Sequence, residues 1–169
     1  MVFSEIKQYK QFKRLNKLKK DILAGICIFF DTFVLMPPVS NKVIFDVCVV
    51  KVDALGDYIL SLDSLHNIIL KYKGKRIVFI CNQIVYELAM QLDIFDEIYP
   101  IEIDKFEKNY FYRFSKLREL KKFKIKISLQ PTFSRNVLIG DSIIRAINSK
   151  INIGHFGDYT NQSKFLKYL

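Results

Sequence analysis

Asp57 is the residue of this sequence best suited to do chemistry, because it follows Gly56 in the first loop after a long apolar run. That run, residues 43–50, is typical of a strand buried on both faces of a parallel sheet. Ligands of such sheets bind beyond the carboxyl ends of the strands. A carboxylate there can act as a general base toward a hydroxyl. Aspartate is also a favoured helix N-cap, and spacing alone leaves both roles open.

The loop itself, residues 51–57, contains a single glycine. It therefore matches neither the GxGxxG nor the GxxxxGK[ST] phosphate-binding pattern. A dinucleotide needs close approach of the backbone to its pyrophosphate, so this loop argues against a nucleotide-binding oxidoreductase.

Short apolar runs alternate with helical patterns along the rest of the chain. Strands are predicted at residues 43–50, 76–81, 96–100, 124–129 and 151–154, and helices at 58–70, 84–92, 106–123 and 136–148. Gly74 is the expected turn before the second strand, and Pro100 is expected to close the third. The alternation predicts an α/β fold, with a Rossmann-like parallel sheet flanked by helices.

Two of these helices show apolar residues at helical spacing. The predicted core-facing residues are Ile59, Leu62, Leu65 and Ile69 in the first helix and Phe111, Phe114, Leu117 and Leu120 in the third.

Residues 1–41 differ from the remainder and are predicted to be a basic, amphipathic helical extension to a domain spanning residues 42–169. Seven basic residues precede an apolar run that Asp31 interrupts and Pro37-Pro38 ends. The apolar part is shorter than the roughly 20 residues that a spanning helix needs. The pattern fits a helix on an anionic membrane surface and equally a helix that packs against its own domain or against a missing one. Both interpretations stay open.

The formal net charge of +10 favours anionic partners, although a lysine-rich genome would give the same bias. Cys27, Cys48 and Cys81 are widely spaced in apolar runs, which predicts reduced thiols in a cytoplasmic protein. With only His66 and His155 as histidines, no metal site and no cofactor is predicted.

Residues 49–60, VVKVDALGDYIL, resemble the first strand, loop and helix of glycosyltransferase family 9, which includes the lipopolysaccharide heptosyltransferases. A second block, residues 127–135 followed by Gly140-Asp141 and residues 153–158, resembles a branch found among cell-surface polysaccharide enzymes. The resemblance extends from about Val43 to Asn161.

The resemblance implies a GT-B architecture and inverting, metal-independent transfer of a sugar from a nucleotide sugar to a glycan or lipid-linked acceptor. Asp57 matches the general base, and Gly56 belongs to the same motif. Lys51 is expected either to bind acceptor phosphate or carboxylate or to pair with Asp53. Asp53 stands where heptosyltransferases commonly carry Ser or Thr, which puts lipid A inner core as the acceptor in doubt.

Ser134 and Arg135 match a Ser-Arg pair that lines the cleft of the family. Arg135 is suited to bidentate anion binding, and its alternative is a surface residue at a helix start. The alternative for Ser134 is the N-cap of a helix from Asn136.

Family 9 enzymes are about twice this length, and their C-terminal domain makes most donor contacts. We therefore expect a half that lacks the donor-binding domain and is inactive alone, whether as a fragment, the product of a degenerate gene or one part of a split enzyme. Its expected location is the cytoplasm, or the periphery of the inner face of the cytoplasmic membrane.

The alternative is a non-enzymatic basic module for nucleic acid or another anionic partner. Its candidate contacts are Lys105, Lys108, Arg113, Lys116, Arg118, Lys121, Lys122, Lys124 and Lys126, interleaved with Phe106, Tyr110, Phe111, Tyr112 and Phe114. At helical spacing the aromatic residues fit a core better, so no nucleic acid is expected.

Overall fold

The computed structural model describes residues 15, 18–19, 21–33 and 43–158. Its centre is a five-stranded sheet in the order β3-β2-β1-β4-β5, in which every neighbouring pair is parallel. The strands are β1 (Val43–Lys51), β2 (Ile77–Asn82), β3 (Glu97–Ile101), β4 (Phe123–Gln130) and β5 (Ile151–Gly154). The predicted α/β class and parallel Rossmann-like sheet are confirmed.

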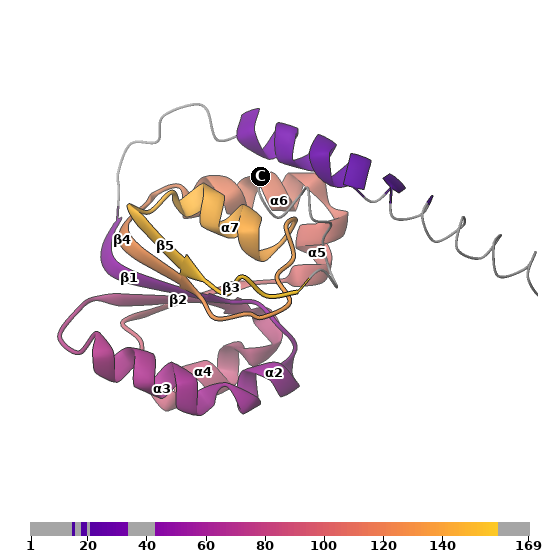
Figure 1. Ribbon diagram of the computed structural model, residues 1–169. Coiled ribbons are helices and arrows are strands. Elements are labelled where there is room, and N and C mark those ends of the chain that lie inside the picture. Colours follow the sequence, from indigo (N-terminus) through magenta and orange to yellow (C-terminus); the bar gives the residue numbers. More distant parts are fainter. Residues whose placement is uncertain (1–14, 16–17, 20, 34–42, 159–169) are drawn as a thin grey trace, which may run out of the picture.

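Helices cover both faces of the sheet (Figure 1). One layer contains α2 (Leu55–Leu60), α3 (Leu62–Lys71) and α4 (Tyr86–Leu92), with a short 3₁₀ turn η1 (Gln83–Val85) before α4. The other contains α5 (Ile103–Lys108), α6 (Tyr110–Leu120) and α7 (Gly140–Ile147). Right-handed βαβ crossovers place helices on both faces of such sheets.

The central strand β1 supplies side chains to a hydrophobic core on each face of the sheet. Cys48 and Val50 pack in the core beneath α5, α6 and α7, whereas Val47 and Val49 pack in the core beneath α2, α3 and α4. All four are at most 1% exposed. A strand buried on both faces explains why residues 47–50 are apolar without alternation.

The predicted strands are confirmed to within a residue or two, but β3 continues through Pro100 to Ile101 instead of closing at the proline. β3 lies at the edge of the sheet, where a missing N–H is tolerated. Gly74 has a φ of 77°, as the predicted turn requires.

Two long predicted helices are each broken in the structure, and the breaks change which residues face the core. Asn109 ends α5 and caps α6, because its Oδ1 accepts a hydrogen bond from Tyr112 N at 3.0 Å. With this change of direction Phe111 is 87% exposed and Arg113 is buried, so the predicted core position of Phe111 is wrong. The break at Ser61 likewise leaves Ile59 half exposed and buries Tyr58 in its place.

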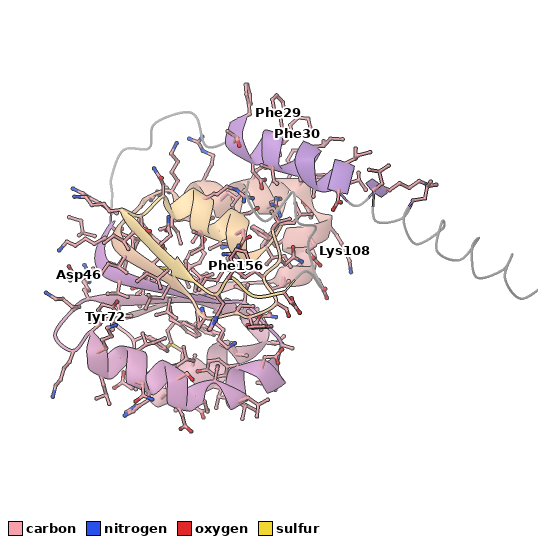
Figure 2. The ribbon with its side chains drawn as sticks, in the orientation of Figure 1. Phe29, Phe30, Asp46, Tyr72, Lys108 and Phe156 are labelled. Carbon is pink, nitrogen blue, oxygen red and sulfur yellow. The ribbon has the colours of Figure 1, made fainter. Side chains whose placement is uncertain are left out.

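Asp46 joins three strands near their amino ends and is labelled in Figure 2. Its carboxylate accepts hydrogen bonds from Arg76 N at 3.1 Å and from Lys126 Nζ at 2.5 Å. The hydrogen bond from Lys126, and to a smaller extent that from Arg76, lowers the pKa of Asp46 below its ordinary value of 3.8.

A lowered folded-state pKa means that the stabilisation is complete above the ordinary pKa and is lost as the pH falls through the folded value. We therefore expect the free energy of unfolding of the wild type to fall more between about pH 6 and about pH 3 than that of Asp46→Asn. Urea unfolding at both pH values measures this. Equal losses would show that the Asp46 contacts contribute nothing to acid stability.

The N-terminal helix (residues 21–33) lies outside the layer that contains α6 and α7 (Figure 1). A cluster of buried polar residues holds it there. Arg113 of α6 donates to Asp31 from Nε at 2.8 Å and from Nη2 at 2.5 Å. Both side chains are no more than 4% exposed.

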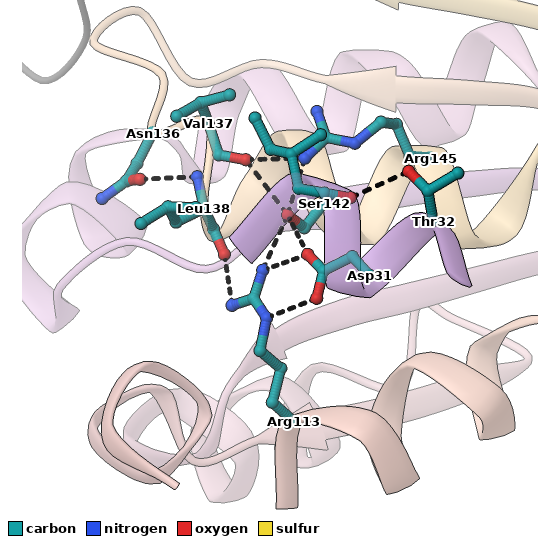
Figure 3. Close-up of polar contacts among 9 residues, drawn as sticks. Asp31, Thr32, Arg113, Asn136, Val137, Leu138, Ser142 and Arg145 are labelled. Atoms are coloured by element: carbon teal, nitrogen blue, oxygen red, sulfur yellow. Dashed lines mark hydrogen bonds and ion pairs between the residues drawn. The ribbon is translucent and has the colours of Figure 1, made fainter. Parts of the chain in front are cut away.

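α7 completes this cluster (Figure 3). Ser142 Oγ accepts from Nη2 of Arg113 and Nη2 of Arg145, both at 2.8 Å, and lies 3.1 Å from Asp31 Oδ2. The remaining guanidinium nitrogen of Arg113 donates to Leu138 O at 2.7 Å. We call Asp31, Arg113, Ser142 and Arg145 the Asp31 cluster.

The interpretation that this helix packs against its own domain is therefore right for one of its faces. The predicted stop at Pro37-Pro38 and the predicted domain boundary at residues 41 and 42 lie outside the described residues. None of the helices in the described part of the chain combines the length and apolar character needed to cross a bilayer.

Candidate functional site

Asp57 lies beyond the carboxyl end of the central strand, in the first turn of α2. The helix begins at Leu55 with Ala54 as its N-cap, so Asp57 is the third residue of the helix and the N-cap interpretation is wrong. The side chain is exposed. Among the described residues, its carboxylate accepts no hydrogen bond and forms no ion pair. A solvent-facing carboxylate that no described side chain pairs with is available to a ligand.

Asp53, in the same loop, ties together the ends of three strands. Its Oδ2 accepts from Lys51 Nζ at the end of β1 and from Thr132 Oγ1 just after β4, both at 2.8 Å. Asn82, the last residue of β2, donates from Nδ2 to the Asp53 carbonyl at 3.4 Å. We call these four residues the Asp53 junction.

Of the two roles predicted for Lys51, the structure shows the pair with Asp53. Lys51 is only 6% exposed, and a buried ammonium needs a compensating charge. A Ser or Thr at position 53 would leave it without one.

Arg135 extends over the ends of β4 and β5. Its Nε lies 3.6 Å from Asp141 Oδ1, and its side chain is 21% exposed. A Cβ added at Gly154 would lie 3.6 Å from Arg135 Nη1, so the guanidinium rests against that glycine. Arg135 is thus held at the same edge of the sheet as the Asp53 junction.

Ser134 is half-buried beside it and does not cap the following helix. That helix, α7, begins at Gly140 rather than at Asn136 as predicted. Asn136 instead forms a turn in which its Oδ1 accepts from Leu138 N at 2.9 Å. The capping alternative for Ser134 is therefore wrong.

Two glycines near the site differ in what surrounds them. Gly157 has a φ of 60°, and a Cβ there would lie 1.9 Å from Phe133 O in the loop that carries Ser134 and Arg135. Gly56 lies in α2 and has no atom within 4 Å of an added Cβ. Gly157 is therefore required by the fold, whereas the space above Gly56 is open.

We expect Gly157→Ala to lower the free energy of unfolding by about 1–3 kcal/mol, because both its backbone conformation and its contact with Phe133 are lost. Gly56→Ala is the matched control and is expected to raise it by about 0.5–1 kcal/mol, as alanine does within helices. Urea unfolding of both variants gives the comparison. Equal effects at the two positions would contradict this account.

Two cysteines lie in the central strands, Cys81 near the carboxyl end of β2 and Cys48 within β1. Burial raises the pKa of the Cys81 thiol to about 12 and also raises that of Cys48, so both stay protonated at neutral pH. The described part of the chain contains no group of three or more His, Cys, Asp or Glu residues placed to hold a metal ion.

The structure therefore brings together most of the predicted site residues at the carboxyl ends of β1, β2 and β4. Thr132 and Asn82 were not predicted as site residues, although each lies at or just after the end of a strand, which is the pattern that identifies such positions. The chain matches no protein-family model, no curated protein and no solved structure. The resemblance to glycosyltransferase family 9 thus rests on the motifs alone.

Proposed function

We propose that this chain contains the acceptor-side domain of a glycosyltransferase similar to family 9, with Asp57 as its general base. One observation carries the proposal. An exposed, unpaired carboxylate lies beyond the carboxyl end of the central strand of a parallel sheet, where ligands of such folds bind. The same residue is the aspartate of the Gly-Asp motif.

In the proposed reaction Asp57 takes the proton of an acceptor hydroxyl as its oxygen attacks the anomeric carbon of the donor. The bond from that carbon to the nucleoside diphosphate breaks, and the diphosphate leaves with the bonding electrons. Attack from the face opposite the leaving group inverts the anomeric centre. The donor would be held by the second domain of a GT-B enzyme, in one cleft with the base.

The neighbouring residues suit the acceptor role. The Asp53 junction fixes the loop that leads into α2, so that Asp57 is presented from a rigid base. Arg135 offers a partly exposed guanidinium to an anionic group of the acceptor. The open space at Gly56 allows an acceptor to approach the backbone beside Asp57. An anionic glycan of a lipopolysaccharide or cell-surface polysaccharide fits these features.

The acceptor role can be tested on the full chain by nuclear magnetic resonance. We would titrate ¹⁵N-labelled protein with a phosphorylated lipopolysaccharide core oligosaccharide and, separately, with the same oligosaccharide after phosphatase treatment. The proposal expects amide shifts at residues 55–58 and 132–135, weaker with the dephosphorylated form. Absence of shifts at both segments with both probes would overturn it.

The nucleic-acid alternative has less support from the structure. Two of its candidate contacts, Phe106 and Arg113, are buried. Lys105, Lys116 and Lys126 form ion pairs with Glu102, Glu119 and Asp46. Shifts confined to residues 105–126 on addition of single-stranded RNA, without shifts from either oligosaccharide, would favour this alternative.

A further inference from the structure

The N-terminal helix turns its largest apolar side chains away from the protein. Figure 2 shows Phe29 and Phe30 pointing outward from it. The residues of this face are between 48% and 68% exposed: Ile22, Leu23, Ile26, Phe29, Phe30 and Phe33. Their spacing of one, three and four residues places them on a single side of the helix. We call these six residues the outer apolar face.

The opposite side of the helix, which carries Ala24, Ile28 and Asp31, is the one that packs on the domain. Ala24 and Asp31 are buried there, and Ile28 packs against the cluster that Ala24 forms with Val137. This is the reverse of an ordinary surface helix, in which the apolar stripe faces the core.

The Asp31 cluster fixes this orientation. Rotating the helix to bury its outer apolar face would remove Asp31 from Arg113 and leave a buried guanidinium without its carboxylate. The structure therefore selects the outward orientation of the apolar side chains.

The exposed apolar area is large for a protein of this size. With about 150–250 Å² for each large side chain, the observed exposures give roughly 600 Å². Contiguous apolar patches of this size mark sites of interaction with a protein or a membrane.

Charge distinguishes between these partners. The first 20 residues of the sequence contain seven basic residues and one acidic residue, and Lys19, which the structure describes, is exposed. A second copy of this chain carries the same net charge of +10, whereas an anionic bilayer surface attracts a basic segment.

We propose that the N-terminal helix docks this protein on anionic membranes, with the outer apolar face inserted at the boundary between headgroups and acyl chains. Because the opposite side of residues 21–33 packs on the domain, only the outer apolar face can meet the bilayer, so the helix lies in the plane of the surface. This inference does not depend on the proposed transferase function.

Vesicle flotation of the full chain tests the proposal. We expect binding to vesicles of phosphatidylcholine and phosphatidylglycerol, with binding to pure phosphatidylcholine weaker by about tenfold. Phe29→Gln/Phe33→Gln is expected to lower the partition coefficient by about tenfold or more, since both rings would leave the apolar layer. The matched control is Leu70→Gln/Ile84→Gln, which changes two residues of similar exposure in the layer on the other side of the sheet and should bind as the wild type does.

A second measurement uses the absence of tryptophan from the sequence. The emission of Phe29→Trp is expected to move to shorter wavelength on addition of anionic vesicles, whereas that of Leu70→Trp is not. Three results would overturn the proposal. They are equal binding by Phe29→Gln/Phe33→Gln and wild type, an unshifted Phe29→Trp, or concentration-dependent dimers that need Phe29 and Phe33 in a protein that does not float.

Discussion

Replacing Asp57 by asparagine is expected to lower the rate of sugar transfer by about 10²–10⁴-fold, the range that a general base contributes. Asparagine keeps the size and the hydrogen-bonding capacity of the side chain but cannot take up the proton of the acceptor. The residue is exposed and unpaired among the described residues, so the fold should not change. The assay needs the donor-binding domain, supplied in a longer polypeptide or as a separate subunit.

Asp63→Asn is the matched control, because Asp63 is an exposed aspartate in the first turn of the next helix, α3. It should transfer sugar at the wild-type rate. Full activity of Asp57→Asn would remove Asp57 from the proposed mechanism. A loss shared equally by both variants would point to helix stability rather than catalysis.

The second large effect is expected at the Asp31 cluster. Asp31→Ala should lower the free energy of unfolding by about 3–5 kcal/mol, because it leaves the Arg113 guanidinium buried without its charge partner. Urea unfolding followed by circular dichroism measures the change. Asp21→Ala, in the same helix, changes a half-buried carboxylate that has no ion pair with a described residue, and it is expected to stay within about 0.5 kcal/mol of the wild type.

The double variant Asp31→Ala/Arg113→Met tests whether the loss of stability comes from the unpaired charge of Arg113. It should recover much of the loss, since the unpaired charge is gone and methionine fills the space of the arginine stem beside Phe106. A loss below about 1 kcal/mol in Asp31→Ala would show that the helix detaches easily and that the cluster does not fix its orientation.

The strands could be predicted from the sequence because each is a short apolar run that is buried locally. β1 and β2 were located to within a residue on this basis. The breaks at Ser61 and Asn109 could not, because the helical periodicity continues through both. Asn109 caps a new helix in spite of this periodicity. As a result Arg113 is buried and Phe111 is exposed.

The candidate site was predicted in part. Asp57 was identified from its position after the first strand, but its interpretation as an N-cap could be excluded only from the start of α2. The contacts of Asp53 with Thr132 and of Arg113 with Asp31 join residues 79 and 82 positions apart. Pairings of this kind depend on tertiary structure and leave no periodic pattern in the sequence.

The Asp31 cluster also has a consequence for the order of events on the ribosome. Ser142 follows Asp31 by 111 residues, so at about 5–20 residues per second it is made roughly 6–22 s later. Throughout that interval the surface on which the nascent N-terminal helix packs is incomplete. An apolar segment in this condition is free to meet a bilayer or a chaperone before the rest of the chain is synthesised.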